Sequence, residues 1–467
     1  MIDSPFSRRS TLKTLSSGFG YLAFAALAQR QAMAESVLAG KAGPLDPKSP
    51  HFVPRAKRVI FLSMQGAPSH LDTFDYKPKL NEDNGKPGAH DTNRGATLLG
   101  SPWEFKQHGQ GGLWMSELFP NLAKHADDLC MLKGMHTDMP NHPQAQTQMH
   151  TGNFQFVRPS LGAWSLYGLG TENTNLPGFV TLNPGRNAQH FGSAFLPAIY
   201  QGAKFGGASR GRRNARRADQ AAIPNIKNPD LSEKQQRQQL DFIQQLNANK
   251  LREDQHHPGV EGAIESFELA FRMQDTLPEV MDLSGESKQM LDLYGVDGGD
   301  TDSFGRQCLL ARRFAESGVR FIEISHGSWD HHRALSEDLP ARCNEIDKPI
   351  QGLLTDLKQR DMLKDTLVIW AGEFGRTPHG QGGDGRDHNH KGYTTWMAGG
   401  GVKGGFSYGA TDDHGYEAVE GRMHIHDWHA TILHLLGLNH EKLTYRHAGR
   451  DFRLTDVHGN VAQEILA

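Results

Sequence analysis

Histidine and carboxylate side chains gather in four stretches of the sequence, and three of these stretches directly follow an apolar run. The apolar runs are residues 58–64, 319–325 and 366–371, and the fourth stretch comes shortly after the third. The candidate metal ligands in the four stretches are Asp72, then Asp330 and His332, then Glu373, and finally His388 and His390. Mixed carboxylate and imidazole donors are typical of zinc, manganese and iron sites, and carboxylates also bind calcium.

This pattern predicts a divalent metal site whose metal the sequence does not identify. Two ions about 3.5–4 Å apart would hold a tetrahedral anion between them and activate water for attack. The competing interpretation is that these are ordinary loop side chains, which cap helices or pair with one another.

Alternating strands and helices would bring the four stretches together. Strands are predicted at residues 58–64, 129–133, 177–182, 319–325, 366–371 and 393–398, and helices at 116–126, 302–317, 348–360 and 427–436. This order is typical of an α/β fold with a mostly parallel sheet covered by helices on both faces. Loops at the carboxyl ends of parallel strands share one edge, so the four stretches can meet in one pocket. Within residues 201–300 we expect a loop and a helical insertion, with helices at 231–252 and 260–275.

Residues 1–34 are typical of a twin-arginine signal peptide. The run SRRSTLK at 7–13 precedes a mild apolar stretch at 19–28, and Ala32-Met33-Ala34 provides a small-residue cleavage site. The apolar stretch is shorter than the roughly 20 residues of a permanent membrane helix. We therefore expect no permanent membrane anchor, export by the twin-arginine machinery, and a periplasmic or secreted protein. Residues 35–56 would be an irregular lead-in to a domain at 57–467.

The net charge and the cysteine content limit which functions the chain can have. The chain carries a net charge of −3, and residues 1–34 contribute +3, so the remainder is near −6. An acidic mature chain argues against nucleic acid as a partner. The three cysteines include no C-x-x-C pair and allow at most one disulfide.

Several stretches spread over residues 57–450 also carry a resemblance. They are HPQAQTQMHTG at 142–152, PSLGAW at 159–164, FLPAIYQG at 195–202, SWDHH at 328–332, GEFGRTP at 372–378 and GRDH at 385–388. These stretches resemble a large family of exported proteins described only as a domain of unknown function related to sulfatases. That family is similar in turn to the alkaline phosphatase and sulfatase superfamily, because residues 366–375 resemble a sulfatase strand ending in Asp-His-Gly. The resemblance implies an alkaline phosphatase-like fold.

The resemblance also implies roles for particular residues. Asp72 takes the place of the first-strand metal carboxylate. Asp330 and His332 (or His331) match the Asp and the His of one metal position. Glu373 stands where the second metal has an acidic ligand, and His388 (or His390) matches a late histidine ligand. Two departures stand out: Phe374 replaces a ligand histidine, and Asn141 and His142 stand where sulfatases have a nucleophilic Cys or Ser.

These assignments lead to a hypothesis with an alternative. The first reading is an exported metal-dependent hydrolase of sulfate or phosphate esters, acting on a small-molecule or glycan ester. Asn141 and His142 would line its pocket, with His142 as acid/base, as ligand or merely as a helix cap, and Arg376 or Arg386 would hold the anion. The alternative is a non-catalytic exported binding protein that keeps the fold, which the altered nucleophile position favours.

Overall fold

The computed structural model describes residues 43–88, 95–206, 230–254 and 258–467, and Pro44–Ala467 forms one compact unit. The predicted signal peptide and the arginine-rich segment at 210–217 lie outside the described residues. No helix in the described part of the chain has the length and apolar character needed to span a membrane.

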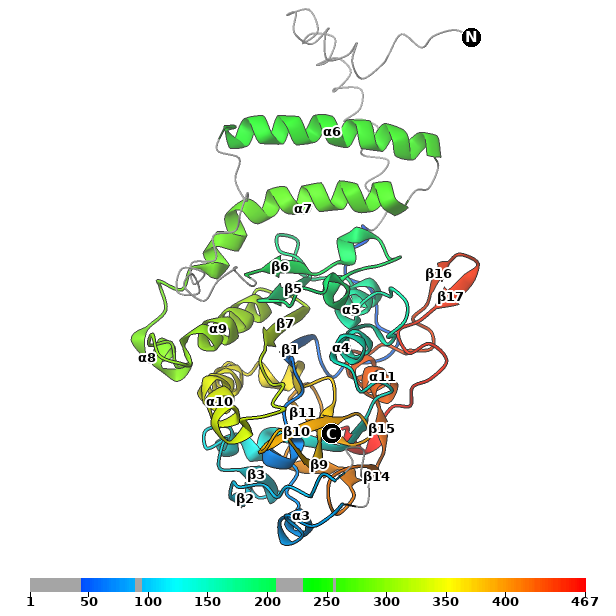
Figure 1. Cartoon of the computed structure of the whole chain (residues 1–467). Coiled ribbons are helices and arrows are strands. Elements are labelled where there is room, and N and C mark those ends of the chain that lie inside the picture. The colour runs from blue at the N-terminus through cyan, green and yellow to red at the C-terminus, as the bar shows by residue number, and fades with distance from the viewer. Residues whose placement is uncertain (1–42, 89–94, 207–229, 255–257) are drawn as a thin grey trace, which may run out of the picture. The chain divides into compact units, whose positions relative to one another are not determined.

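A central sheet organises this unit (Figure 1). Its nine strands in the described residues follow the order β12 (Phe406–Tyr408), β4 (Leu129–His136), β11 (Tyr393–Ala398), β8 (Thr366–Ala371), β1 (Arg58–Met64), β7 (Phe321–His326), β5 (Phe179–Leu182) and β6 (Ala203–Phe205), and β15 (Met423–His424) pairs with β4. Only β11 runs against its neighbours β4 and β8, while the other pairings are parallel. The predicted α/β class with a mostly parallel sheet is confirmed.

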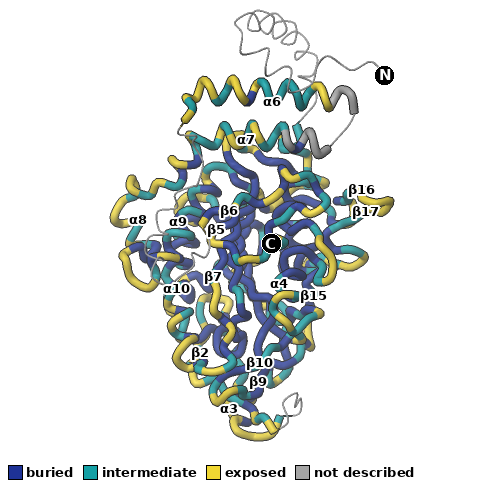
Figure 2. Tube along the Cα trace, turned by 45° about the horizontal axis from the view of Figure 1, so that its top comes forward, coloured by how far each residue is buried: buried dark blue, intermediate teal, exposed yellow. Residues whose placement is uncertain are grey.

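Helices cover both faces of the sheet because its strands are apolar on both sides. In β1, Ile60 and Leu62 pack with α9 (Asp302–Glu316) and α10 (Leu335–Gln359). The alternate residues Val59 and Phe61 pack with α5 (Leu161–Leu169) and α11 (Ile425–Leu435). Successive side chains of a strand point to opposite faces, so one strand contributes to both cores. Figure 2 shows the buried strands between the two helical layers.

The region predicted as an insertion holds three helices in its described part. They are α6 (Glu233–Asp254), α7 (Pro258–Met281) and α8 (Lys288–Leu293). Helix α7 packs against the 3-10 turn Ala198–Tyr200 and against α9, whereas α6 packs on α7. Figure 2 shows α6 as mostly exposed or half-buried, so it contributes little to the core.

Some predicted elements need correction. The helix expected at 116–126 is instead the end of β3 (Leu113–Ser116) followed by a 3-10 segment at Leu122–Asp128, because Pro120 cannot donate a hydrogen bond inside a helix. The helix expected at 348–360 starts at Leu335 and runs through Pro340 and Pro349. The stretch expected as a loop at 372–376 ends in the first two residues of β9 (Gly375–Gln381), and most of the stretch at 385–390 is β10 (Gly385–Asn389), which pairs with β9 in a hairpin.

Candidate metal centre

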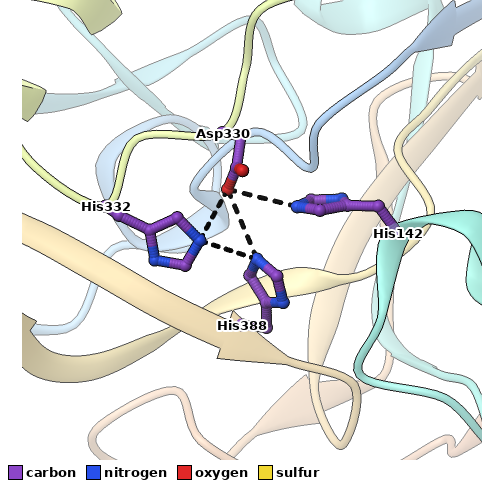
Figure 3. A group of neighbouring side chains, drawn as sticks. All are labelled: His142, Asp330, His332 and His388. Atoms are coloured by element: carbon purple, nitrogen blue, oxygen red, sulfur yellow. Dashed lines mark hydrogen bonds and ion pairs between the residues drawn. The ribbon is translucent and has the colours of Figure 1, made fainter.

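Four side chains from three separate parts of the chain converge at the carboxyl edge of the sheet (Figure 3). His142 is the first residue of α4 (His142–Thr151), which follows β4. Asp330 and His332 lie between β7 and α10, and His388 lies on β10. One ligand atom from each residue lies within 4.8 Å of the others. We call these four residues the histidine–aspartate cluster.

The outer nitrogen of each imidazole in the cluster is held by an oxygen acceptor. Nδ1 of His142 lies 2.6 Å from a carboxylate oxygen of Glu373, and Nδ1 of His388 lies 2.7 Å from the carbonyl of Pro140. Nδ1 of His332 contacts the side-chain oxygen of Gln381. Each Nδ1 therefore carries a proton, and each Nε2 faces the cluster, where its lone pair would be available to a cation once any second proton is displaced. This arrangement of outer acceptor and inner lone pair is typical of metal-binding histidines.

The inner atoms of the cluster, which are the Nε2 nitrogens and Oδ1 of Asp330, lie closer together than uncharged imidazole rings would favour. Nε2 of His332 lies 2.9 Å from Nε2 of His388 and 2.9 Å from Oδ1 of Asp330. Nε2 of His142 is buried and lies 3.1 Å from the same carboxylate oxygen, but within the described residues it makes no well-angled hydrogen bond. Two imidazole lone pairs that face each other repel unless a proton or a cation lies between them.

The protonation of His142 and Asp330 follows from their neighbours. Burial opposes a charge on His142, but the adjacent carboxylates of Asp330 and Glu373 outweigh it and raise its pKa to about 9. Burial likewise favours the neutral acid at Asp330, yet His142, His388 and Arg376 lower its pKa far below the usual range. The cluster thus combines an ionised carboxylate with imidazoles. Three nitrogens and one carboxylate oxygen suit zinc, manganese or iron, whereas calcium prefers an all-oxygen shell.

Arg376 supports Asp330 and does not face the solvent. Its Nη2 lies 2.7 Å from Oδ1 of Asp330, and its other guanidinium nitrogens donate to backbone carbonyls, including those of Ala67 and Arg386. The side chain is 1% exposed. The structure therefore does not place Arg376 where it would contact a substrate anion, because its guanidinium is enclosed by partners within the protein.

Asp72 lies outside the cluster and pairs with Arg386. Nε and Nη2 of Arg386 lie 2.7 Å and 3.0 Å from the two carboxylate oxygens, and both side chains are fully buried. Arg386 is likewise enclosed by protein partners and is not placed where it would contact a substrate anion. Nor does the structure bring His390 into the cluster; its backbone carbonyl accepts a hydrogen bond from Thr137.

Glu373 lies one layer behind the cluster, where it orients a ligand. Its carboxylate is fully buried and accepts hydrogen bonds from Nδ1 of His142, the side chain of Gln146 and the backbone N–H of Gly66. Gly66 has φ +108, and a Cβ there would lie 2.8 Å from the backbone nitrogens of Trp329 and Asp330. Glycine at this position lets the loop after β1 support both Glu373 and Asp330.

Three neighbours complete the surroundings. Phe374 is buried and packs on the rings of His142 and His388 at 4.8 Å and 4.7 Å between centroids. Asn141 is exposed at the N-cap of α4, and its side chain bonds that of Gln144. Of the two histidines left open as alternatives, His332 joins the cluster and His331 does not. The sequence grouped His142 with the catalytic candidates. Gln146, four residues on and on the same face of α4, also bonds Glu373, a pairing that is visible only in the structure.

Replacing Glu373 with glutamine is expected to weaken metal binding about 10- to 100-fold while the fold is kept. The amide is isosteric but a weaker acceptor for the Nδ1 proton of His142, so the ring is less basic and less fixed. Competition with a chelating dye would measure the metal affinity. An affinity equal to that of the unaltered protein would contradict the orienting role of Glu373.

The fold and the cluster together define an α/β protein with a candidate mononuclear metal centre at the carboxyl edge of its sheet. The chain belongs to the family described as "Protein of unknown function (DUF1501)", whose profile matches residues 56–466. This confirms the family resemblance that the sequence motifs carry. No curated protein matches the sequence.

Solved structures similar to this chain include sulfatases and phosphatases. The PsFucS1 sulfatase from Pseudoalteromonas sp. is 14% identical, with 83% of this chain and 69% of that chain covered and a TM-score of 0.36. The lipoteichoic acid synthase LtaP from Listeria monocytogenes is 10% identical, with 88% and 78% covered and a TM-score of 0.38. The alkaline phosphatase from the Antarctic bacterium TAB5 is 11% identical, with 83% and 99% covered and a TM-score of 0.32.

Proposed function

We propose that this protein is a metal-dependent hydrolase of sulfate or phosphate esters that works outside the cytoplasm. The observation that carries the proposal is the set of three imidazoles whose outer nitrogens are bonded to oxygen acceptors and whose inner nitrogens meet Asp330. A divalent cation held there would polarise a bound ester oxygen and activate water for attack.

The residues of this chain would hold and orient that cation. His142, His332, His388 and Asp330 supply the four donor atoms, and Glu373 keeps the proton of His142 on its outer nitrogen. The positive charge of Arg376 keeps Asp330 ionised. The Asp330 side chain is 43% exposed, so an ester can approach the cluster on its side.

The number of protein ligands favours a second candidate function. Zinc sites with four protein ligands are typically structural, whereas catalytic sites keep one position for water or substrate. In the second candidate, the ion would stabilise an exported binding protein and perform no chemistry. Rearrangement of one ligand or a fifth coordination position would be needed for hydrolysis.

Ester hydrolysis measured after metal exchange distinguishes the hydrolase from the exported binding protein. The chelator-treated protein would be reloaded with zinc, manganese, iron or calcium and assayed with 4-nitrophenyl sulfate, 4-nitrophenyl phosphate and bis(4-nitrophenyl) phosphate. We expect hydrolysis of at least one ester with zinc, manganese or iron, and none with calcium or without metal. A metal that raises the melting temperature but supports no hydrolysis would favour the structural role.

Metal affinity is expected to rise with pH up to about pH 9. In the metal-free protein the pKa of His142 is raised to about 9, so this ring is protonated at neutral pH and a metal must displace the proton. One displaced proton corresponds to about a tenfold gain in affinity per pH unit below that pKa and no gain above it. Titration with a metal buffer between pH 7 and pH 10 would measure the slope. A flat profile over pH 7–9 would show that His142 is not a ligand.

Export is part of the proposal and rests on the amino-terminal residues. The twin-arginine run, the apolar stretch and the small-residue cleavage site occur in the order that such signals require. Replacing both Arg8 and Arg9 with lysine should retain the protein in the cytoplasm of a bacterial host, as cell fractionation would reveal. Unchanged export of this variant would exclude the twin-arginine route.

A further inference from the structure

A second histidine-rich site lies beside the metal centre, in a cavity of about 560 Å³ at the amino end of α11. This volume is in the range of small-molecule sites, about 300–1,000 Å³. Three imidazoles line the cavity, those of His424, His426 and His458, and the rings of His426 and His458 stack at 5.2 Å between centroids. None of these residues belongs to the histidine–aspartate cluster.

One of the histidines that line the cavity has a nitrogen without a hydrogen-bond partner in the described residues. His426 is 6% exposed, and its Nδ1 makes no hydrogen bond within the described residues. Leaving a buried polar atom unpaired is unfavourable, so a ligand that bonds it is favoured. Burial, together with neighbouring His424 and His458, lowers the pKa of His426 to about 4, so the ring is neutral at pH 7. A neutral imidazole can both donate and accept, which matches a hydroxyl group.

The charges around the cavity exclude an anionic ligand. The carboxylates of Asp138, Asp427 and Glu441 line it, and no lysine or arginine is among the described residues that do so. A sulfate or phosphate group would meet three like charges there. The charged part of an ester substrate therefore belongs at the metal centre and not in this cavity.

A metal ion does not fit the cavity either. The two oxygens of Asp138 accept from His424 and Gln148, and those of Asp427 accept from the backbone of His424 and from Asn460. Nδ1 of His424 accepts the backbone N–H of His426 as a helix cap, so its ring has no free lone pair for a metal. The donor atoms of this site do not converge as those of the histidine–aspartate cluster do.

The cavity and the metal centre share one segment of chain. Asp138 lines the cavity, the carbonyl of Pro140 holds His388, and His142 is a member of the cluster. Four residues of extended chain span at most about 14 Å, so one extended ligand can reach both sites. The rim of the cavity also presents Val457, which is 73% exposed and offers an apolar contact.

We propose that this cavity binds an uncharged, hydroxyl-rich unit such as a sugar ring, which belongs to the substrate whose ester group reacts at the metal centre. The inference deepens the proposed function and rests on it for the link to an ester. The hydroxyls of the ring pair with His426 and with the polar rim, and its C–H face packs on the stacked imidazoles and Val457.

Binding of neutral sugars tests this inference directly. The methyl glycosides of glucose, galactose and mannose would be titrated into the full-length mature protein by saturation-transfer NMR, with inorganic sulfate as the anionic probe. We expect at least one glycoside to bind, with an affinity about tenfold lower in His426→Leu, because one or two hydrogen bonds are lost. His434→Leu is the matched control, since this histidine lies on the same helix but does not line the cavity.

Two further variants distinguish sugar binding in the cavity from ester hydrolysis at the metal centre. Val457→Trp, a change at an exposed position that leaves the core intact, should also abolish glycoside binding by filling the rim. The inference is overturned if no glycoside binds, if His426→Leu and Val457→Trp bind as the unaltered protein does, or if sulfate binds in their place. Glycoside binding should persist in His388→Ala, in which ester hydrolysis should be lost. Glycoside binding by an unaltered protein that hydrolyses none of the esters with any metal would refute the proposed function alone.

Discussion

Replacing His388 with alanine is expected to weaken metal binding roughly 100- to 1,000-fold. Zinc sites with four ligands bind with about 10–16 kcal/mol, so one ligand accounts for roughly a quarter of that energy. The Nε2 atom of His388 is one of the four convergent donors, and its Nδ1 is held by the carbonyl of Pro140. Isothermal titration of the chelator-treated protein with zinc would measure the change.

His390→Ala is the matched control for this substitution. It removes the same side chain two positions away, and the structure leaves that ring out of the cluster. Its metal affinity and its hydrolysis rate should equal those of the unaltered protein, whereas hydrolysis by His388→Ala should be lost. Equal effects of the two substitutions would mean that the cluster is not the metal centre.

Replacing Asp72 with alanine is expected to destabilise the fold by about 3–5 kcal/mol. The change leaves the guanidinium of Arg386 buried and without its carboxylate, which is the costly way to break a buried ion pair. The remaining contacts of Arg386 with the carbonyls of Leu99 and Thr377 do not neutralise its charge. Chemical denaturation followed by circular dichroism would give the free energy of unfolding.

The double variant Asp72→Leu with Arg386→Met provides the control. It removes both charges and fills the space with apolar groups, so most of the lost stability should return. Metal affinity per folded molecule should stay unchanged in both variants, because Asp72 lies outside the cluster. A loss of metal binding in the folded double variant would return Asp72 to the ligand set.

The strands of the sheet were predictable because their signals are local. Residues 58–64, 366–371 and 393–398 are apolar runs with the bounds of β1, β8 and β11. The direction of β11 was not predictable, since an apolar run does not encode whether its neighbours are parallel. The hairpin of β9 and β10 was missed because it is rich in glycine and charge, which is unlike a typical strand.

The site was predictable to the level of the loops but not of the single side chains. The rule that ligands meet at the carboxyl edge selected the stretches that hold Asp330, Glu373 and His388. This rule could not show that Asp72 forms an ion pair with Arg386, or that Glu373 lies behind His142 as its hydrogen-bond acceptor. Those choices depend on pairings between residues more than 200 positions apart, which no local pattern contains.

The most direct measurement is anomalous diffraction from a crystal of the zinc-loaded protein at the zinc edge. We expect one strong peak about 2.0–2.2 Å from Nε2 of His142, His332 and His388 and from a carboxylate oxygen of Asp330. A peak at Asp72 or in the cavity at α11, or no peak in the cluster, would contradict the assignment of the histidine–aspartate cluster as the metal centre.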